Sequence, residues 1–202
     1  MTGNNINHQI TDDHSMANSQ RRLDLFRHYL FLFSVSGALI ALDQWTKYLV
    51  RNSLEFGEMW TPWYWLSPYA RIVHWQNSGA AFGMFQSGGQ IFAVLAVIVS
   101  IMIIYYFPQV PRSDTVLRFA MTLQLAGAVG NLIDRIHQGY VTDFISIGTF
   151  PVFNVADSSI TIGVGVLLLA IWIAEQQEKV KRKSGEEILE VNEGREETAT
   201  GD

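Results

Sequence analysis

The chain has 202 residues, of which 49% are hydrophobic and 16% are charged, and this length suits a single domain. Cysteine is absent, which excludes disulfides, thiolate metal sites and a cysteine nucleophile. The formal net charge of -5 comes partly from an acidic tail at residues 186–202, and no basic stripe interleaved with aromatics occurs, so nucleic acid is not an expected partner.

Residues 1–24 form a polar segment rich in Asn, Asp, Ser and Gln. Such a segment lacks the apolar side chains that a packed core needs, so we expect a disordered arm. The charged tail at residues 176–202 is the counterpart at the other end. We therefore divide the chain into this arm, a membrane domain at residues 25–175, and the tail.

Four blocks between these ends carry no ionised side chain: residues 30–42, 91–107, 119–133 and 160–174. A membrane helix needs about 20 mostly apolar residues, and only residues 91–107 come close unaided. The other three reach spanning length with the polar residues at 43–47, 131–135 and 154–159. The blocks predict an all-α integral membrane protein, a four-helix transmembrane bundle with a small extracytoplasmic region of strand and loop.

The first block could also be a signal peptide, because a basic stretch precedes an apolar core. No clear small-residue cleavage site closes that core. Removing it would leave three spans with a less consistent arrangement of charge.

Lysines and arginines in short flanks stay on the cytoplasmic side of a membrane, which orients the four spans. Nine flanking cations fall on the side of the two termini: Arg21, Arg22, Arg27, Arg112, Arg118, Lys179, Lys181, Arg182 and Lys183. Four fall on the other: Lys47, Arg51, Arg71 and Arg135. Both termini are therefore expected in the cytoplasm, and the polar ends of the first, third and fourth spans meet at the outer face.

The first outer loop, at about residues 52–89, is rich in aromatic side chains, which favour the interface of water and lipid. An ordinary aromatic belt at the membrane surface, with no specific role in function, is sufficient to explain these side chains. Residues 71–75 alternate enough for a short strand, and the Gly-rich residues 87–90 predict a turn. The basic residues 179–183 follow the last span and are expected to contact anionic lipid head groups.

Asp143 and Asp157 are the candidates for catalysis, because each lies among apolar neighbours near the membrane without an adjacent cation. Two carboxylates held close in a site of low dielectric share a proton. One can then take a proton from water while the other protonates the carbonyl oxygen, which is the chemistry of amide hydrolysis.

Other interpretations of the polar residues stay open at this stage. Asp43 and Lys47 are four residues apart, as are Gly127, Asn131 and Arg135 in series, so each set lines one helix face. One interpretation is that these polar groups have a purely structural role and hold the helices of the bundle together.

Three further hypotheses assign these polar residues to catalysis, metal binding or transport. Ser158 or Ser159 could form a dyad with Lys47 as base. A metal site at Asp43, Asp143 and Asp157 is another possibility, although His74 and His137 are isolated. A proton-coupled transporter also carries acids in its spans, but its site is usually near the midplane.

Five stretches resemble, in order, the signatures of the bacterial lipoprotein signal peptidase family, signal peptidase II. They are Asp-Gln-Trp-Thr-Lys (43–47), Asn-Ser-Gly-Ala-Ala-Phe (77–82), Gly-Ala-Val-Gly-Asn-Leu-Ile-Asp-Arg (127–135), Val-Thr-Asp-Phe (141–144) and Phe-Asn-Val-Ala-Asp-Ser (153–158). The resemblance covers about residues 25–175 and leaves both tails unexplained.

The resemblance implies an aspartic endopeptidase of the bacterial inner membrane that removes the signal peptide of diacylglyceryl-modified prolipoproteins, cutting before the lipid-bearing cysteine. It implies no cofactor and no metal. The expected partners are the lipid-modified precursor and membrane lipids, with the chain acting as a monomer. The family's catalytic pair matches Asp143 and Asp157, and Asp134 matches a position outside that pair. Supporting or substrate-facing positions match Asp43, Lys47, Asn77, Gly127, Asn131, Arg135, Asn154 and Ala156.

Overall fold

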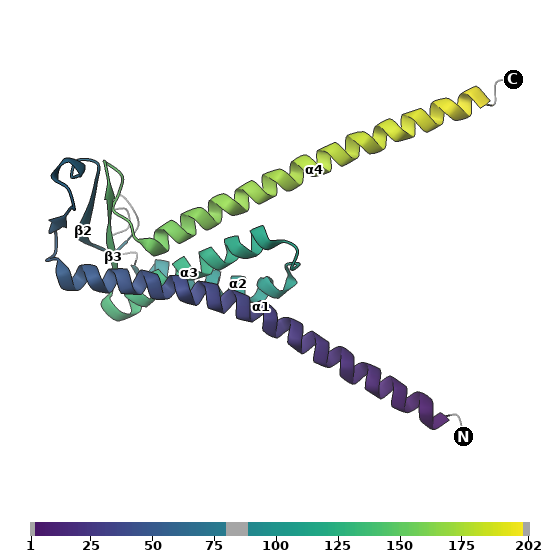
Figure 1. The fold of residues 1–202 in the computed structure, drawn as a ribbon, viewed down its shortest axis with the longest axis horizontal. Coiled ribbons are helices and arrows are strands. Elements are labelled where there is room, and N and C mark those ends of the chain that lie inside the picture. Colours follow the sequence, from purple (N-terminus) through teal and green to yellow (C-terminus); the bar gives the residue numbers. More distant parts are fainter. Residues whose placement is uncertain (1–2, 80–88, 200–202) are drawn as a thin grey trace.

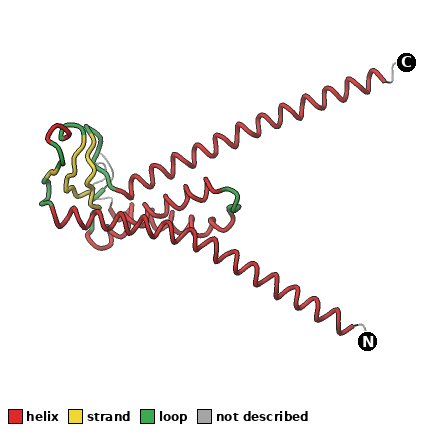
Figure 2. The backbone as a smooth tube through the Cα atoms, in the orientation of Figure 1, coloured by secondary structure: helices red, strands yellow, loops and turns green. Residues whose placement is uncertain are grey.

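The structure is a computed structural model that describes residues 3–79 and 89–199. Its long helices are α1 (Gly3–Ser53), α2 (Gly89–Tyr106), α3 (Thr115–Gln138) and α4 (Val155–Ala199), with short 3-10 helices η1 (Tyr64–Leu66) and η3 (Phe107–Gln109). The strands are β1 (Met59–Trp60), β2 (Ala70–Asn77) and β3 (Val141–Ile147). Figure 1 shows the strands gathered at one end of the helices, and Figure 2 shows how little of the chain is strand.

Within the described residues, four helices are long and apolar enough to cross a membrane, which confirms the predicted fold class. The candidate spans are Asn18–Ser53, Gly89–Gln109, Thr115–Gln138 and Val155–Val180. Of the polar residues that were added to the short apolar blocks, 43–47, 131–135 and 155–159 lie within these helices, and Asn154 directly precedes α4. In α2 and α4 most apolar side chains are exposed, as expected for a surface that faces lipid.

Helix α3 lies at the centre of the bundle and packs against the other three helices. Its buried face carries small residues, among them Gly127 and Gly130. A Cβ on Gly130 would come within 2.8 Å of the Asp43 carboxylate oxygen and 3.2 Å of the Ala156 Cβ. Glycine at this position therefore allows α1, α3 and α4 to approach closely where their polar ends meet.

A buried apolar cluster holds the other end of the bundle, away from the sheet. It consists of Leu32, Ile103, Phe107 and Leu125, one residue from each of α1, α2, η3 and α3. The adjoining turn at η3 contains Pro108, which cannot continue a helix and so ends α2. Apolar packing thus secures one end of the bundle and leaves the other end to polar contacts.

The three strands form one antiparallel sheet in the order β1-β2-β3. The strand predicted at residues 71–75 lies inside β2, and its partner β3 pairs Val141 with Asn77 and Asp143 with Trp75. Gly139 ends α3 with a positive φ of 79°, so β3 can begin two residues later. Of the turn predicted at residues 87–90, residues 87 and 88 lie outside the described residues, and Gly89 already belongs to α2.

The structure continues α1 back to Gly3 and α4 on to Ala199, and the disorder expected at residues 1–24 stays a prediction. A helix satisfies its own backbone hydrogen bonds, and the tail is rich in the helix formers Glu and Lys. Both termini extend away from the sheet end (Figure 1). The division of the chain at residues 24 and 175 stays a prediction.

Gly127→Ala is expected to destabilise the fold. The new Cβ would collide with the Ala156 carbonyl oxygen and lie 2.5 Å from Ile160 Cγ1, so α3 and α4 must move apart. We expect a loss of about 2 kcal/mol in the free energy of unfolding, measured as a lower Tm in detergent. Gly165→Ala is the control, because no atom lies within 4 Å of its Cβ. Equal Tm values for the two variants would contradict the close approach.

Candidate active site

A fully buried lysine lies where the polar ends of α1 and α3 meet. Lys47 Nζ is 2.8 Å from Asp43 Oδ2 and 3.0 Å from Asp134 Oδ2, and it donates to Asn131 Oδ1 at 2.9 Å. An ammonium without partners at this depth would be very costly. Three oxygen acceptors, from α1 and α3, therefore hold Lys47 in place.

The two carboxylates beside Lys47 also bind the backbone of neighbouring elements. Asp43 Oδ1 accepts from the Ala156 N–H of α4 at 2.9 Å, and Asp134 Oδ2 accepts from the Thr142 N–H of β3 at 3.1 Å. Gln44 Nε2 lies within 3.3 Å of both carboxylates. The network thus connects α1 and α3 to the start of α4 and to β3.

Helix α4 begins with a capping box formed by Asn154 and Asp157. Asn154 Oδ1 accepts from the Asp157 N–H at 2.9 Å, and Asp157 Oδ2 accepts from the Asn154 N–H at 3.2 Å. This exchange satisfies two backbone donors at the helix start. It also fixes the Asp157 carboxylate on the first turn of α4.

The Asn154 side chain joins this helix start to Asp143 on β3. Its Nδ2 donates to Asp143 Oδ1 at 2.7 Å and to Asn131 Oδ1 at 3.1 Å. Asn77, at the end of β2, donates to Asp143 Oδ2 at 2.9 Å, and Asn131 donates to Asp157 Oδ1 at 2.7 Å. Three asparagines therefore orient the two carboxylates, and Asn154 contacts both of them.

Burial raises the pKa of Asp143 to about 7, and the negative charge of Asp157 acts in the same direction. Hydrogen bonds from Asn77 and Asn154, and the charge of Lys47, oppose this rise. Asp143 therefore carries its proton below about pH 7, which is the protonation state that a carbonyl-activating acid requires.

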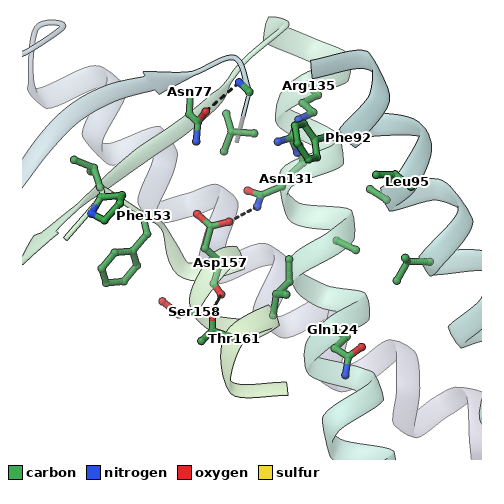
Figure 3. Close-up of a pocket in the computed structure, with 18 of the residues that line it drawn as sticks. Asn77, Phe92, Leu95, Gln124, Asn131, Arg135, Phe153, Asp157, Ser158 and Thr161 are labelled. Atoms are coloured by element: carbon green, nitrogen blue, oxygen red, sulfur yellow. Dashed lines mark hydrogen bonds between the residues drawn. The ribbon is translucent and has the colours of Figure 1, made fainter. Parts of the chain in front are cut away.

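A cavity of about 830 Å³ opens beside Asp157. Asn131 and Asp157 face each other at its wall in Figure 3, with Arg135 and Phe92 above them. Asp143 is only 1% exposed, since its asparagine partners cover it, so the cavity reaches the pair at Asp157. Most of the wall is apolar and comes from α2, α4 and the loop before α4, including Leu95, Val99, Phe150, Pro151, Val152, Phe153, Ile160 and Ile162.

Arg135 lies at the polar end of the cavity. Its guanidinium is 5.5 Å from the Phe92 ring centroid, and its Nη1 donates to the Asn131 carbonyl at 3.4 Å. Its Nε is buried without a partner among the described residues. The side chain thus presents a cation near Asp157 without pairing to it directly.

The geometry bears on the serine and metal alternatives. Ser158 and Ser159 donate to the backbone carbonyls of Asn154 and Val155, whereas Lys47 is committed to its three acceptors. Asp43 is held by Lys47 and α4, so it does not join the aspartate pair. In the described ranges no group of three or more metal-binding side chains comes together.

The structure places all ten predicted site residues at this end of the bundle, with Gly127 providing the close contact to Ala156. It adds Gln44, Arg51 and Thr142, which the sequence analysis missed. Arg51 Nη1 donates to Thr142 Oγ1 at 3.1 Å and lies 3.8 Å from Asp134 Oδ1. Arg51 follows Lys47 by four residues, so helical spacing could have placed it on the same face.

Residues 35–173 match the family model described as signal peptidase (SPase) II. The lipoprotein signal peptidase of Halalkalibacterium halodurans is 38% identical over 159 residues, which cover 77% of this chain and 99% of the relative. That of Acinetobacter baumannii is 38% identical over 176 residues, covering 80% of this chain and 96% of the relative.

A solved structure described as a bacterial membrane enzyme, determined by the in meso method at 2.3 Å resolution, has the same fold. It superposes with a TM-score of 0.65 at 31% sequence identity and covers 70% of this chain and 87% of that chain. Residues 35–173, which match the family model, include all ten predicted site residues. The chain therefore belongs to the signal peptidase II family of membrane peptidases.

Proposed function

We propose that this protein is an aspartic endopeptidase that removes the signal peptide from diacylglyceryl-modified prolipoproteins, cutting before the lipid-bearing cysteine. The observation that carries the proposal is the pair of aspartates, the buried Asp143 and the half-buried Asp157, both bonded to Asn154 beside an apolar cavity. The names of its relatives support the substrate class.

In the proposed reaction the two aspartates share one proton. Asp157, which lines the cavity, removes a proton from water as the water oxygen attacks the scissile carbonyl carbon. Asp143 donates its proton to the carbonyl oxygen, which gives a tetrahedral diol. The proton on Asp157 then passes to the amide nitrogen, and the proton that Asp143 gave up returns from the diol. The C–N bond breaks to leave a carboxyl group and an amine.

Asn77 marks where the substrate carbonyl would reach Asp143, because its side chain lines the cavity and its amide donates a hydrogen bond to Asp143. We propose that the substrate carbonyl takes the position of the Asn77 amide at Asp143 Oδ2. The apolar wall formed by α2 and α4 suits the signal helix and the acyl chains of the lipid.

We propose further that the protein works as a monomer in the bacterial inner membrane, with both termini in the cytoplasm and the active site near the outer face. The bias of flanking lysines and arginines supports this orientation. The termini and the sheet lie at opposite ends of the bundle (Figure 1), which fits a substrate helix leaving the membrane at the sheet end.

Asp143→Asn and Asp157→Asn should each reduce turnover about a thousandfold or more, because an amide cannot share the proton. Cleavage of a purified lipidated precursor measures the effect, and Tm in detergent shows that the variants remain folded. Ser158→Ala is the matched control and should cleave at nearly the normal rate. Near-normal cleavage by both aspartate variants, or none by a folded Ser158→Ala, would overturn the aspartic mechanism.

Asp134→Asn and Asp43→Asn should act mainly on stability. Each removes a charged partner of the buried Lys47 ammonium, which is expected to cost about 3 kcal/mol of unfolding free energy. The expected result is a lower Tm and yield, with turnover per folded molecule retained. A normal Tm combined with lost turnover would show that these acids act in the chemistry.

Cleavage should require the diacylglyceryl group on the precursor. The apolar cavity wall offers contacts for acyl chains that an unlipidated precursor cannot make. The measurement compares kcat/KM for lipidated and unlipidated forms of one precursor. Equal values would show that the proposed substrate class is wrong and would leave the peptidase activity itself intact.

A further inference from the structure

Two arginines converge on one histidine at the end of the bundle away from the sheet. Arg118, in the first turn of α3, has Nη1 at 2.7 Å from His28 Nδ1 on α1. Arg112, in the loop before α3, has Nε at 3.3 Å from His28 Nε2. Both ring nitrogens of His28 therefore face a guanidinium N–H.

This arrangement has more donors than acceptors. A neutral imidazole carries one proton, so only one of its nitrogens can accept a hydrogen bond. If Nδ1 accepts from Arg118, the Nε2 proton of His28 points at a donor of Arg112. The other tautomer moves the same conflict to Arg118, and a protonated ring would conflict with both.

Arg118 has a buried charge for which the described part of the chain supplies no acidic partner. The residue is 6% exposed, and its hydrogen bonds run through Nη1, to His28 and to the Val110 carbonyl at 3.3 Å. Its guanidinium lies 4.4 Å from the Phe107 ring centroid, which offsets part of the cost of burial. Within the described ranges no carboxylate lies within 4 Å of it, so Nε and Nη2 can take a further acceptor.

Arg112 pairs with the carboxylate of Asp24 on α1. Its Nη2 is 2.9 Å from Asp24 Oδ1, and the two side chains are 43% and 60% exposed. Exposed pairs of this kind contribute little. The cluster of His28, Arg112 and Arg118 thus retains positive charge and unused donors where the helices leave the apolar core.

We propose that this cluster binds the phosphate of an anionic lipid head group. Phosphate oxygens match the guanidinium fork and supply the acceptors that His28 cannot give to both arginines. Basic pockets between membrane helices are suited to anionic head groups, and this one lies between His28 of α1, the loop before α3 and the first turn of α3. The site is separate from the aspartate pair and does not depend on the proposed peptidase mechanism.

The test uses the full chain in a neutral detergent and measures Tm against added short-chain phosphatidylglycerol. We expect a saturable rise in Tm, because a ligand that binds only the folded state stabilises it. Short-chain phosphatidylcholine should give a smaller rise in Tm, because the positive charge of its choline group is repelled by the two arginines. An equal rise with inorganic phosphate at the same concentration would overturn the assignment to lipid.

Variants with opposite expected effects make the test specific. Arg112→Gln should weaken phosphatidylglycerol binding about tenfold, because it removes one charge-assisted hydrogen bond to the phosphate. Asp24→Asn should tighten binding, because it removes the competing carboxylate. Arg22→Gln is the control, because Arg22 is an exposed arginine on α1 outside the cluster, and it should leave phosphatidylglycerol binding unchanged. Arg112→Gln is preferred to a change at buried Arg118, which also packs against Phe107. The same affinity in Arg112→Gln and Arg22→Gln would overturn the proposal.

Discussion

The rest of the structure depends on the burial of one ammonium group, that of Lys47. At 0% exposure the charge must be met by acceptors, and these come from Asp43, Asp134 and Asn131. Each acceptor is then committed to another element: Asp43 to the start of α4, Asp134 to β3, and Asn131 to Asp157. A shift of α1, α3 or α4 would break several of these bonds at once, so the charge sets how these three helices fit together.

The same network positions the two candidate catalytic carboxylates. Asp143 and Asp157 come from a strand and from a helix start, and neither element alone could hold both. Asn154 joins them because it caps α4 while its amide donates to Asp143. Glycine at 130 permits this arrangement, since a larger residue would push α3 away from Asp43 and Ala156. The hydrogen bonds of the polar network therefore depend on the close approach of the helix backbones. The apolar cluster around Phe107 holds the opposite end of the bundle together.

The sequence alone predicted the class of fold and the family. Charge-free blocks indicate membrane helices because ionised side chains are costly in the bilayer, and three of the four blocks reach spanning length once the polar residues beside them are included. Helical spacing placed Asp43 and Lys47 on one face, and the five motifs identified the family that the comparisons then confirmed. The choice of Asp143 and Asp157 as catalytic residues also came from sequence and stays a proposal. The disorder expected at residues 1–24 stays a prediction.

Only the tertiary structure decided which polar groups meet. Sequence spacing describes one helix at a time, whereas Asn154 contacts residues on α3 and β3, and Gln44 bridges to Gly130 and Asp134 at distances that no spacing rule contains. Arg112 and Arg118 counted only as flanking charges until packing brought both to His28. The raised pKa of Asp143 likewise depends on burial and on the nearby Asp157, which lies fourteen residues away in the chain. Side-chain burial and contacts between elements are properties of the packed molecule, so they could not be obtained from the order of residues alone.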